Sequence, residues 1–311
     1  MKKIYHVEPV LESFVWAGDK ITEYYGYQTT MTKVGQAYHV IALPDHLDNI
    51  IRETKEHLSE FFERHPELFD YQYPIFPIRM ATSCGQGLMS YHLHPNDEYA
   101  WQHEHCRGKV SGGVAILDKP NETVYKRMGH TAKTIEEFKE LFEKRDFDNL
   151  LQRVEVKPNQ FLNTPAGVIH SGGGSETMSV VFSTNSDITY RMYDYERDDP
   201  KRPLHLKQAF ECLNMPETDL KPHDIIDEKQ PGMIIHHYYS KHNEYTAKGF
   251  TVKGEGTYEC DQFLFILCVK GQGMIHDTAI HKGETLFIPA HFGPFVLKGE
   301  MECMSISYIE E

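Results

Sequence analysis

The stretch Gly87–Pro95 reads GLMSYHLHP, an apolar run that carries two histidines, His92 and His94, two positions apart. Because a β-strand sends alternate side chains to one face, both imidazoles are predicted to point the same way. Two neutral imidazoles on one face can take two coordination positions of a divalent metal ion. A chain with 19 histidines also produces such a triplet by chance. The pair by itself therefore leaves two interpretations open, a metal site and ordinary strand histidines.

Short candidate strands surround this stretch on both sides. Each is bounded by Gly, Pro or Asn, and such a series is typical of antiparallel sandwiches and barrels. The candidates are residues 37–43, 88–94, 114–117, 123–127, 160–163, 178–183 and 189–193, followed in the last third of the chain by 233–239, 250–252, 263–269, 285–288 and 301–309. The fold class is therefore predicted to be mainly β.

Two segments have the apolar periodicity of amphipathic helices. The first covers residues 45–67. The second begins at Thr134, which forms a capping box with Glu137, and runs on toward Leu151. A third, short helix is predicted over about 205–213, inside a proline-rich segment that we interpret as the connection between two domains.

A faint internal repeat links the two halves of the chain. Residues 157–167 read KPNQFLNTPAG and residues 282–290 read KGETLFIPA, so that each half has a lysine turn, a strand and a Pro-Ala turn. This repetition favours two copies of one jelly-roll β-barrel. We predict a first domain over 1–229, which includes the helical insertions and the connecting segment, and a degenerate second domain over 230–311. The second copy has no histidine pair in the matching strand, so only the first is predicted to hold a metal.

Composition and charge exclude several classes of protein. The formal net charge of −14 repels a phosphate backbone, and no basic stripe with interleaved aromatic residues is present, so no nucleic-acid partner is expected. No run approaches the ~20 apolar residues of a membrane span, and the first lysines have no apolar core behind them. Six cysteines without CxxC spacing suit a reducing compartment. We expect a cytoplasmic protein with no membrane partner.

A third histidine, His170, follows the turn Pro165–Gly167. After such a turn in a small barrel, the side chain is expected to face inward and to complete the triangle begun by His92 and His94. The polar stretch His103–His105 offers candidates for a fourth ligand, although histidines in such a stretch are more often solvated.

Four segments follow one another in a recognisable order. They read HLHPNDEYA at 92–100, TPAGVIH at 164–170, NSDITYR at 185–191 and RPLHL at 202–206. Together they resemble the signature of type I mannose-6-phosphate isomerases in their short bacterial form, a zinc-dependent double-cupin family. The resemblance runs from about residue 72 to 213, and the motifs are specific as a set rather than singly. It implies two cupin barrels and a metal-dependent aldose–ketose isomerase that acts on mannose 6-phosphate, fructose 6-phosphate or a related sugar or sugar phosphate.

The resemblance also implies the metal ligands. The family's Gln-x-His pair falls on His92 and His94, and the histidine after its Pro-x-Gly turn falls on His170. The family's metal-ligating glutamate falls on Ser111, so we expect a set of three histidines instead. Three imidazoles leave a divalent ion with its full charge and with open positions. Zn²⁺ is the expected ion, and Fe²⁺, Mn²⁺ and Ni²⁺ are alternatives.

Two residues are expected to be catalytic. By the same resemblance, the arginine that is credited with a catalytic role in the family falls on Arg191. The lysine of the family's Gly-Lys-Thr-Glu segment falls on Lys109. Both are expected to stabilise developing negative charge or to bind an anionic group. A guanidinium stays protonated, so Asp187 or Glu104 is a better candidate for the proton acceptor.

Other departures from the family leave a changed substrate open. They lie at 16–18, 35–38 and 183–185. Besides the isomerase, two hypotheses remain: a cupin oxygenase with iron on three histidines, and a non-catalytic carbohydrate-binding cupin. The expected partner is a small sugar or sugar phosphate, and both a monomer and a homodimer stay open.

Overall fold

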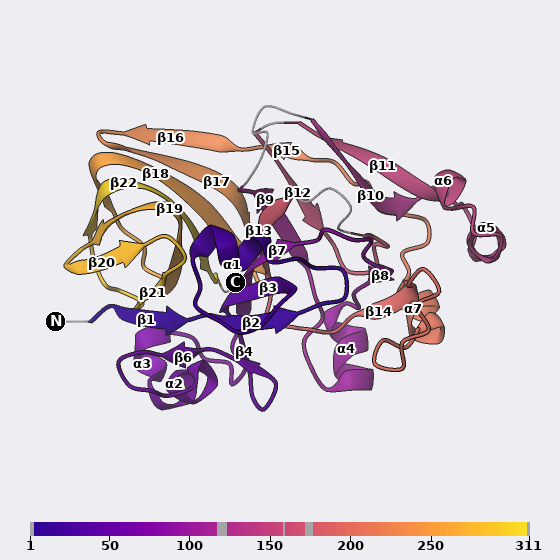
Figure 1. The fold of residues 1–311 in the computed structure, drawn as a ribbon, viewed down its shortest axis with the longest axis horizontal. Coiled ribbons are helices and arrows are strands. Elements are labelled where there is room, and N and C mark those ends of the chain that lie inside the picture. The colour runs from indigo at the N-terminus through magenta and orange to yellow at the C-terminus, as the bar shows by residue number, and fades with distance from the viewer. Residues whose placement is uncertain (1–2, 117–122, 158, 172–176, 310–311) are drawn as a thin grey trace.

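Two large antiparallel sheets make up most of the protein (Figure 1). The computed structural model describes residues 3–116, 123–157, 159–171 and 177–309. In pairing order, the nine-stranded sheet contains β16 (Ile226–Gln230), β17 (Met233–Lys241), β18 (Tyr245–Tyr258), β22 (Phe295–Ser307), β19 (Leu264–Ile275), β21 (Thr285–Ile288), β1 (Tyr5–Glu8) and β6 (Ile50–Ile51), and β20 (Thr278–His281) pairs with β19. The prediction of a mainly β chain is confirmed.

The second large sheet has seven strands. In pairing order they are β15 (His223–Asp224), β12 (Gln160–Thr164), β9 (Ser111–Ala115), β13 (Met178–Thr184), β7 (Ile78–Cys84), β3 (Val34–Val40) and β2 (Val10–Ser13). Three two-stranded sheets join β10 (Val124–His130) to β11 (Leu151–Val156), β14 (Tyr190–Tyr193) to β8 (Tyr91–Leu93), and β4 (Ala42–Leu43) to β5 (Leu47–Asp48). The β8–β14 pair carries the HxH stretch.

Strand pairing crosses the predicted domain boundary at 229/230. Strand β1 pairs with β21, where Tyr5 lies opposite Phe287, and β6 pairs with β1, where Ile51 lies opposite Val7. The N-terminal strand therefore belongs to the sheet of the C-terminal half, as Figure 1 shows at its left. The division into folding units at this boundary stays a prediction.

The prediction of one helix over residues 45–67 is wrong. Strands β5 and β6 occupy its first part, and only α2 (Leu58–Arg64) and α3 (Pro66–Phe69) are helical. The side chain of Asn49 binds the main chain of an earlier segment. Its Oδ1 accepts from the Ile41 N–H, and its Nδ2 donates to the Tyr38 carbonyl. Pairing of Ile51 with β1 then fixes the extended backbone. Apolar residues at helical spacing are buried here by a sheet.

The other two predicted helices are present in shorter form. The capping box is real, since Thr134 Oγ1 accepts from the Glu137 N–H before α5 (Ile135–Glu143). The run toward Leu151 breaks into α6 (Phe147–Leu150) and the start of β11. The third is α7 (Leu206–Cys212), and two further helices, α1 (Lys20–Tyr25) and α4 (Asp97–Glu104), were not predicted.

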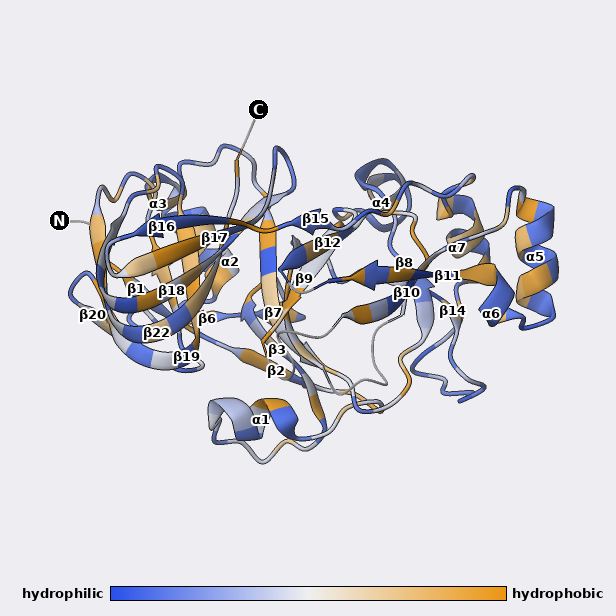
Figure 2. Ribbon diagram, turned by 90° about the horizontal axis from the view of Figure 1, so that it is seen from above, coloured by the Kyte–Doolittle hydropathy of each residue, from blue (hydrophilic) through white to orange (hydrophobic). Residues whose placement is uncertain are grey.

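The largest apolar cluster joins the two sheets. Phe161 and Phe182 of the seven-stranded sheet belong to the same buried cluster as Phe265 and Phe287 of the nine-stranded sheet. The ring centroids of Phe69 and Phe287 lie 4.7 Å apart. One edge of the nine-stranded sheet is polar. Figure 2 shows that the edge strand β16 is almost wholly hydrophilic, whereas its neighbour β17 is more hydrophobic. Charged residues on an edge strand hinder pairing with other chains.

All six cysteines are free, and Cys84, Cys268 and Cys303 are buried, while the other three are only partly buried. Within the described ranges, no helix has both the length and the apolar character needed to cross a membrane.

Candidate active site

The three predicted metal ligands come together beside the β8–β14 pair. The main chains of His92 and His170 exchange two hydrogen bonds, with N–O distances of 3.0 Å and 2.8 Å. The side-chain ligand atoms of His92, His94 and His170 all lie within 4.8 Å of one another. The structure thus places the HxH pair and the histidine after the Pro-Ala-Gly turn at one point.

Each imidazole is oriented by a main-chain carbonyl. The Nδ1 atoms of His92, His94 and His170 lie 2.8 Å, 2.7 Å and 2.9 Å from the carbonyl oxygens of Ser90, Ile188 and Val168. A carbonyl can only accept, so each Nδ1 carries the hydrogen and each Nε2 keeps a lone pair. Three neutral nitrogen donors are therefore held ready for one ion.

Burial keeps these imidazoles uncharged. It is the main reason why the pKa values of His92 and His94 lie well below the usual 6.5, and it lowers the pKa of His170 to about 4. The positive charge of Lys109 acts on all three in the same direction. Since a metal binds neutral imidazole, the site is ready for an ion without losing protons at neutral pH.

Two glycines bring the separate segments into contact. Gly108 lies so close to the Asn96 main chain that a Cβ would stand 2.3 Å from its carbonyl carbon. The next residue, Lys109, donates its main-chain N–H to the Pro95 carbonyl at 3.0 Å. Gly167, at a φ of 78°, donates to the His94 carbonyl at 2.8 Å. Lys109 and the His170 turn are thereby fixed to the strand end that carries His94.

Lys109 is a buried cation beside the histidines. Its side chain is 8% exposed, and no described residue accepts a hydrogen bond from its Nζ. Burial, together with the nearby charge of Arg79, lowers the pKa of Lys109 to about 7, although Asp187 acts in the opposite direction. A buried lysine with so strongly lowered a pKa is typical of a functional site.

Arg79 was not predicted as a site residue, but its charge contributes to the lowered pKa of Lys109. Its Nη1 donates to the Ser186 carbonyl at 2.9 Å and lies 3.5 Å from Asp187 Oδ1. Its Nη2 donates to Gln36 Oε1 at 2.8 Å. The sequence could have identified Arg79 as a charged residue inside the apolar segment 78–84, because such residues are rarely buried without a partner.

Asp187 belongs to this group of charges. Burial tends to raise the pKa of its carboxyl, but the charges of Arg79 and Lys109 and the hydrogen bond from His46 outweigh burial and hold the pKa below its usual value. Asp187 therefore stays ionised and neutralises the two cations in part.

Arg191, the other predicted catalytic cation, lies next to His92. It is the cross-strand partner of His92 in the β14–β8 sheet. Its Nη1 donates to the Pro203 carbonyl at 3.2 Å, and its buried Nε has no hydrogen-bond partner among the residues that the structure describes. Burial, followed by repulsion from Arg202, lowers the pKa of Arg191. The guanidinium still remains charged in the physiological range.

The proposed fourth ligands do not join the cluster. His103 and Glu104 lie in α4, and His105 ends that helix. Glu104 instead accepts a hydrogen bond from the Tyr190 hydroxyl at 2.8 Å. Within the described part of the chain, no carboxylate belongs to the metal-ligand group. The donor set is therefore three nitrogens, which fits a zinc-type ion with an open position.

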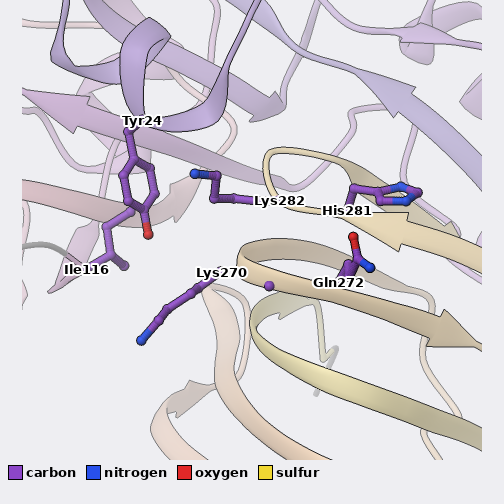
Figure 3. A pocket seen from close by; sticks show the side chains of 7 residues that line it. Tyr24, Ile116, Lys270, Gln272, His281 and Lys282 are labelled. Atoms are coloured by element: carbon purple, nitrogen blue, oxygen red, sulfur yellow. The ribbon is translucent and has the colours of Figure 1, made fainter.

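A separate cavity of about 690 Å³ lies between α1 and the nine-stranded sheet (Figure 3). Tyr24, Lys270, His281 and Lys282 are among the residues that line it. Its charged groups already have partners, since Lys270 pairs with Glu302, His281 pairs with Glu284, and Lys282 packs on the Tyr24 ring. None of the residues that line it is a predicted site residue.

Known proteins resemble this chain over almost its full length. The family model described as the cupin domain of mannose-6-phosphate isomerase matches residues 235–308. Bacillus subtilis has a mannose-6-phosphate isomerase, ManA, with 30% identity over 96% of both chains, and a probable mannose-6-phosphate isomerase, GmuF, with 29% identity over 96% of this chain and 97% of its own.

Solved structures agree with these matches. A Bacillus subtilis mannose 6-phosphate isomerase has a TM-score of 0.90 at 25% identity, and the match covers 98% of this chain and 99% of that chain. A phosphomannose isomerase mutant from Salmonella typhimurium shares the fold, with a TM-score of 0.76 at 12% identity over the whole of both chains. The cupin fold is thereby confirmed, and so is an enzyme of the isomerase type. This chain belongs to the mannose-6-phosphate isomerase family.

Proposed function

We propose that this protein is a metal-dependent aldose–ketose isomerase for mannose 6-phosphate and fructose 6-phosphate or a closely related sugar phosphate. The observation that carries the proposal is the convergence of three neutral imidazoles within 4.8 Å, next to the cations Lys109 and Arg191. The names of the Bacillus subtilis relatives support the substrate class.

His92, His94 and His170 hold the metal in this proposal. Zn²⁺ suits three nitrogen donors best, while Fe²⁺, Mn²⁺ and Ni²⁺ accept the same ligands. Such an ion supplies Lewis-acid polarisation of a sugar carbonyl or of its neighbouring hydroxyl. The carbonyls of Ser90, Ile188 and Val168 keep the three rings in place, so little rearrangement accompanies binding.

The cations stabilise the charge that isomerisation creates. Moving a proton between adjacent sugar carbons passes through an enediol, which places negative charge on oxygen. Arg191 lies opposite His92 in the strand pair and stays charged, and the charge of Lys109 acts on all three imidazoles. Because Lys109 is buried and Arg191 is partly buried, each interacts with an oxyanion more strongly than a fully exposed cation does.

Direct measurement of isomerisation tests the proposal. The purified protein is incubated in ²H₂O with mannose 6-phosphate, fructose 6-phosphate and the unphosphorylated sugars, with and without a chelator. We expect deuterium at the carbon next to the carbonyl, interconversion of one aldose–ketose pair, and loss of both after chelation. If no sugar exchanges a proton and the protein takes up oxygen instead, the protein is a cupin oxygenase with iron on three histidines. A ligand set without a carboxylate also suits that enzyme. A protein that binds no metal would be the non-catalytic cupin.

A further inference from the structure

The charges around the three clustered imidazoles are unbalanced. After burial, positive charges lower the pKa values of these rings: Lys109 acts on all three. Arg191 also acts on His92, and Lys126 also acts on His170. In the part of the chain that the structure describes, no carboxylate is among the main contributions to these pKa values or among the candidate ligands. A divalent ion on three neutral nitrogen donors therefore keeps its full charge in a positive environment.

Lys126 is the third of these cations, and no sequence motif pointed to it. Its strand, β10, runs beside the turn that carries His170, because Met128 and His170 form a β-bridge. Lys126 shares one face of β10 with Met128 and lies opposite Val154 of β11. Met128 and Val154 belong to one buried apolar cluster. The partly buried Lys126 thus places a cation among apolar side chains on the strand next to a candidate ligand.

Carboxylates compensate these cations poorly. Burial is the cause that lowers the pKa of Lys126, and among the described residues no carboxylate forms an ion pair with it. Asp187 acts on Lys109 but is shared with Arg79, whose Nη1 lies 3.5 Å from its Oδ1. Asp194, which acts on the third cation, accepts hydrogen bonds from two other arginines. Adding a divalent ion to such a surplus of positive charge is unfavourable unless negative charge enters with it.

We propose that the three-histidine centre takes up its metal ion together with a small carboxylate from solution, which offsets the charges of the ion and of Lys109, Lys126 and Arg191. The inference rests on the metal site of the proposed function and adds a second ligand to it. Carboxylate oxygens are ordinary ligands of zinc-type ions, and they accept hydrogen bonds from ammonium and guanidinium groups. Nitrate carries the same charge but coordinates such ions weakly, so it serves as the comparison anion.

The affinity for a metal in different anions tests this inference. Co²⁺ is the probe, because its visible absorption reports the ligands around the ion. Its Kd for the full chain is measured by calorimetry in sodium nitrate, sodium acetate and sodium phosphate at equal ionic strength and pH. We expect acetate to lower the Kd at least about tenfold relative to nitrate and to change the visible spectrum. Free acetate competes weakly with the protein for Co²⁺, so an effect in solution alone would have the opposite sign.

Lys126→Met separates the surplus charge from the metal ligands. The substitution removes one positive charge and keeps an unbranched side chain on an apolar face, so the unfolding temperature should not fall. In nitrate, Co²⁺ should bind this variant about threefold to tenfold more tightly than wild type, and acetate should improve binding less. A purely structural defect would weaken metal binding instead. Lys207→Met, which removes an exposed cation of α7, is the matched control and should change neither value.

The outcomes separate this inference from the proposed function. Equal Kd values in nitrate and acetate, an effect of phosphate alone, or weaker Co²⁺ binding by Lys126→Met overturns the joint uptake, and isomerisation by the same protein then leaves the proposed function standing. Lack of Co²⁺ binding in every anion overturns the metal site and the joint uptake together. Acetate-dependent binding by a protein that interconverts no sugar phosphate supports the joint uptake and overturns the proposed function alone.

Discussion

Arg191 lies directly opposite His92 across the two-stranded sheet of β14 and β8. Side chains at such positions share one face, so a permanent cation stands next to a candidate metal ligand. Its charge is one of the causes, after burial, that keep the pKa of His92 low. Strand pairing thus couples the cation to the metal site.

Replacing Arg191 should affect the chemical step more than folding. Arg191→Met removes a partly buried positive charge next to developing negative charge, and such losses lower kcat by about 10²- to 10³-fold. Arg191→Lys should recover part of the activity, because it keeps the charge without the planar fork. Steady-state kinetics with the best sugar phosphate checks this. Arg153→Met is the control, since Arg153 lies exposed on β11, and an equal loss there would contradict the assignment.

Removal of one imidazole should abolish metal binding. His94→Ala leaves two nitrogen donors and leaves the Ile188 carbonyl without its partner. We expect metal content after dialysis, measured by mass spectrometry, to fall from one ion per chain to a small fraction of that. His281→Ala removes an exposed histidine of β20 and should keep the full content. Full metal content in His94→Ala would contradict the three-histidine site.

The rate should decline at alkaline pH because of Lys109. Its pKa is lowered to about 7, chiefly by burial, so the free protein loses this positive charge above neutrality. If the charge is needed, kcat/KM falls about tenfold per pH unit above pH 7. Lys109→Arg keeps the cation and should remove the decline. A pH profile of Lys109→Arg with the same alkaline limb as wild type would show that another group is responsible.

His39 should make the protein less stable in acid. It is wholly buried, its Nδ1 has no hydrogen-bond partner in the described part of the chain, and burial lowers its pKa from 6.5 to about 3. The unfolded chain therefore takes up a proton below pH 6.5 that the folded chain cannot bind until about pH 3. The unfolding free energy falls by about 1.4 kcal/mol per pH unit in this window.

Denaturant titrations at pH 7.5 and pH 5.0 measure this effect. The wild type should lose about 2 kcal/mol more between these conditions than His39→Gln, which cannot take up the proton. The comparison cancels the contributions of the other buried histidines. Equal losses in both proteins would contradict a neutral His39.

Local sequence patterns correctly predicted the features that depend only on residues close together in the chain. Alternation placed His92 and His94 on one strand face, and a capping box located α5 at Thr134. The same reasoning failed for residues 45–67, where Asn49 and the pairing of Ile51 with Val7 impose strands on a helical pattern. Periodicity reports which side chains are buried, and a sheet can bury them as well as a helix can.

The sequence by itself determined the mainly β fold, the order of the motifs and the three histidines, because side-chain alternation, turn residues and ligand chemistry are local properties. Only the tertiary structure decided that β1 joins the C-terminal sheet, that Arg191 lies opposite His92, and that Arg79 lies opposite Ser183. Those relationships come from hydrogen-bond register between strands far apart in the chain. A shift of one residue in that register would turn each side chain to the other face.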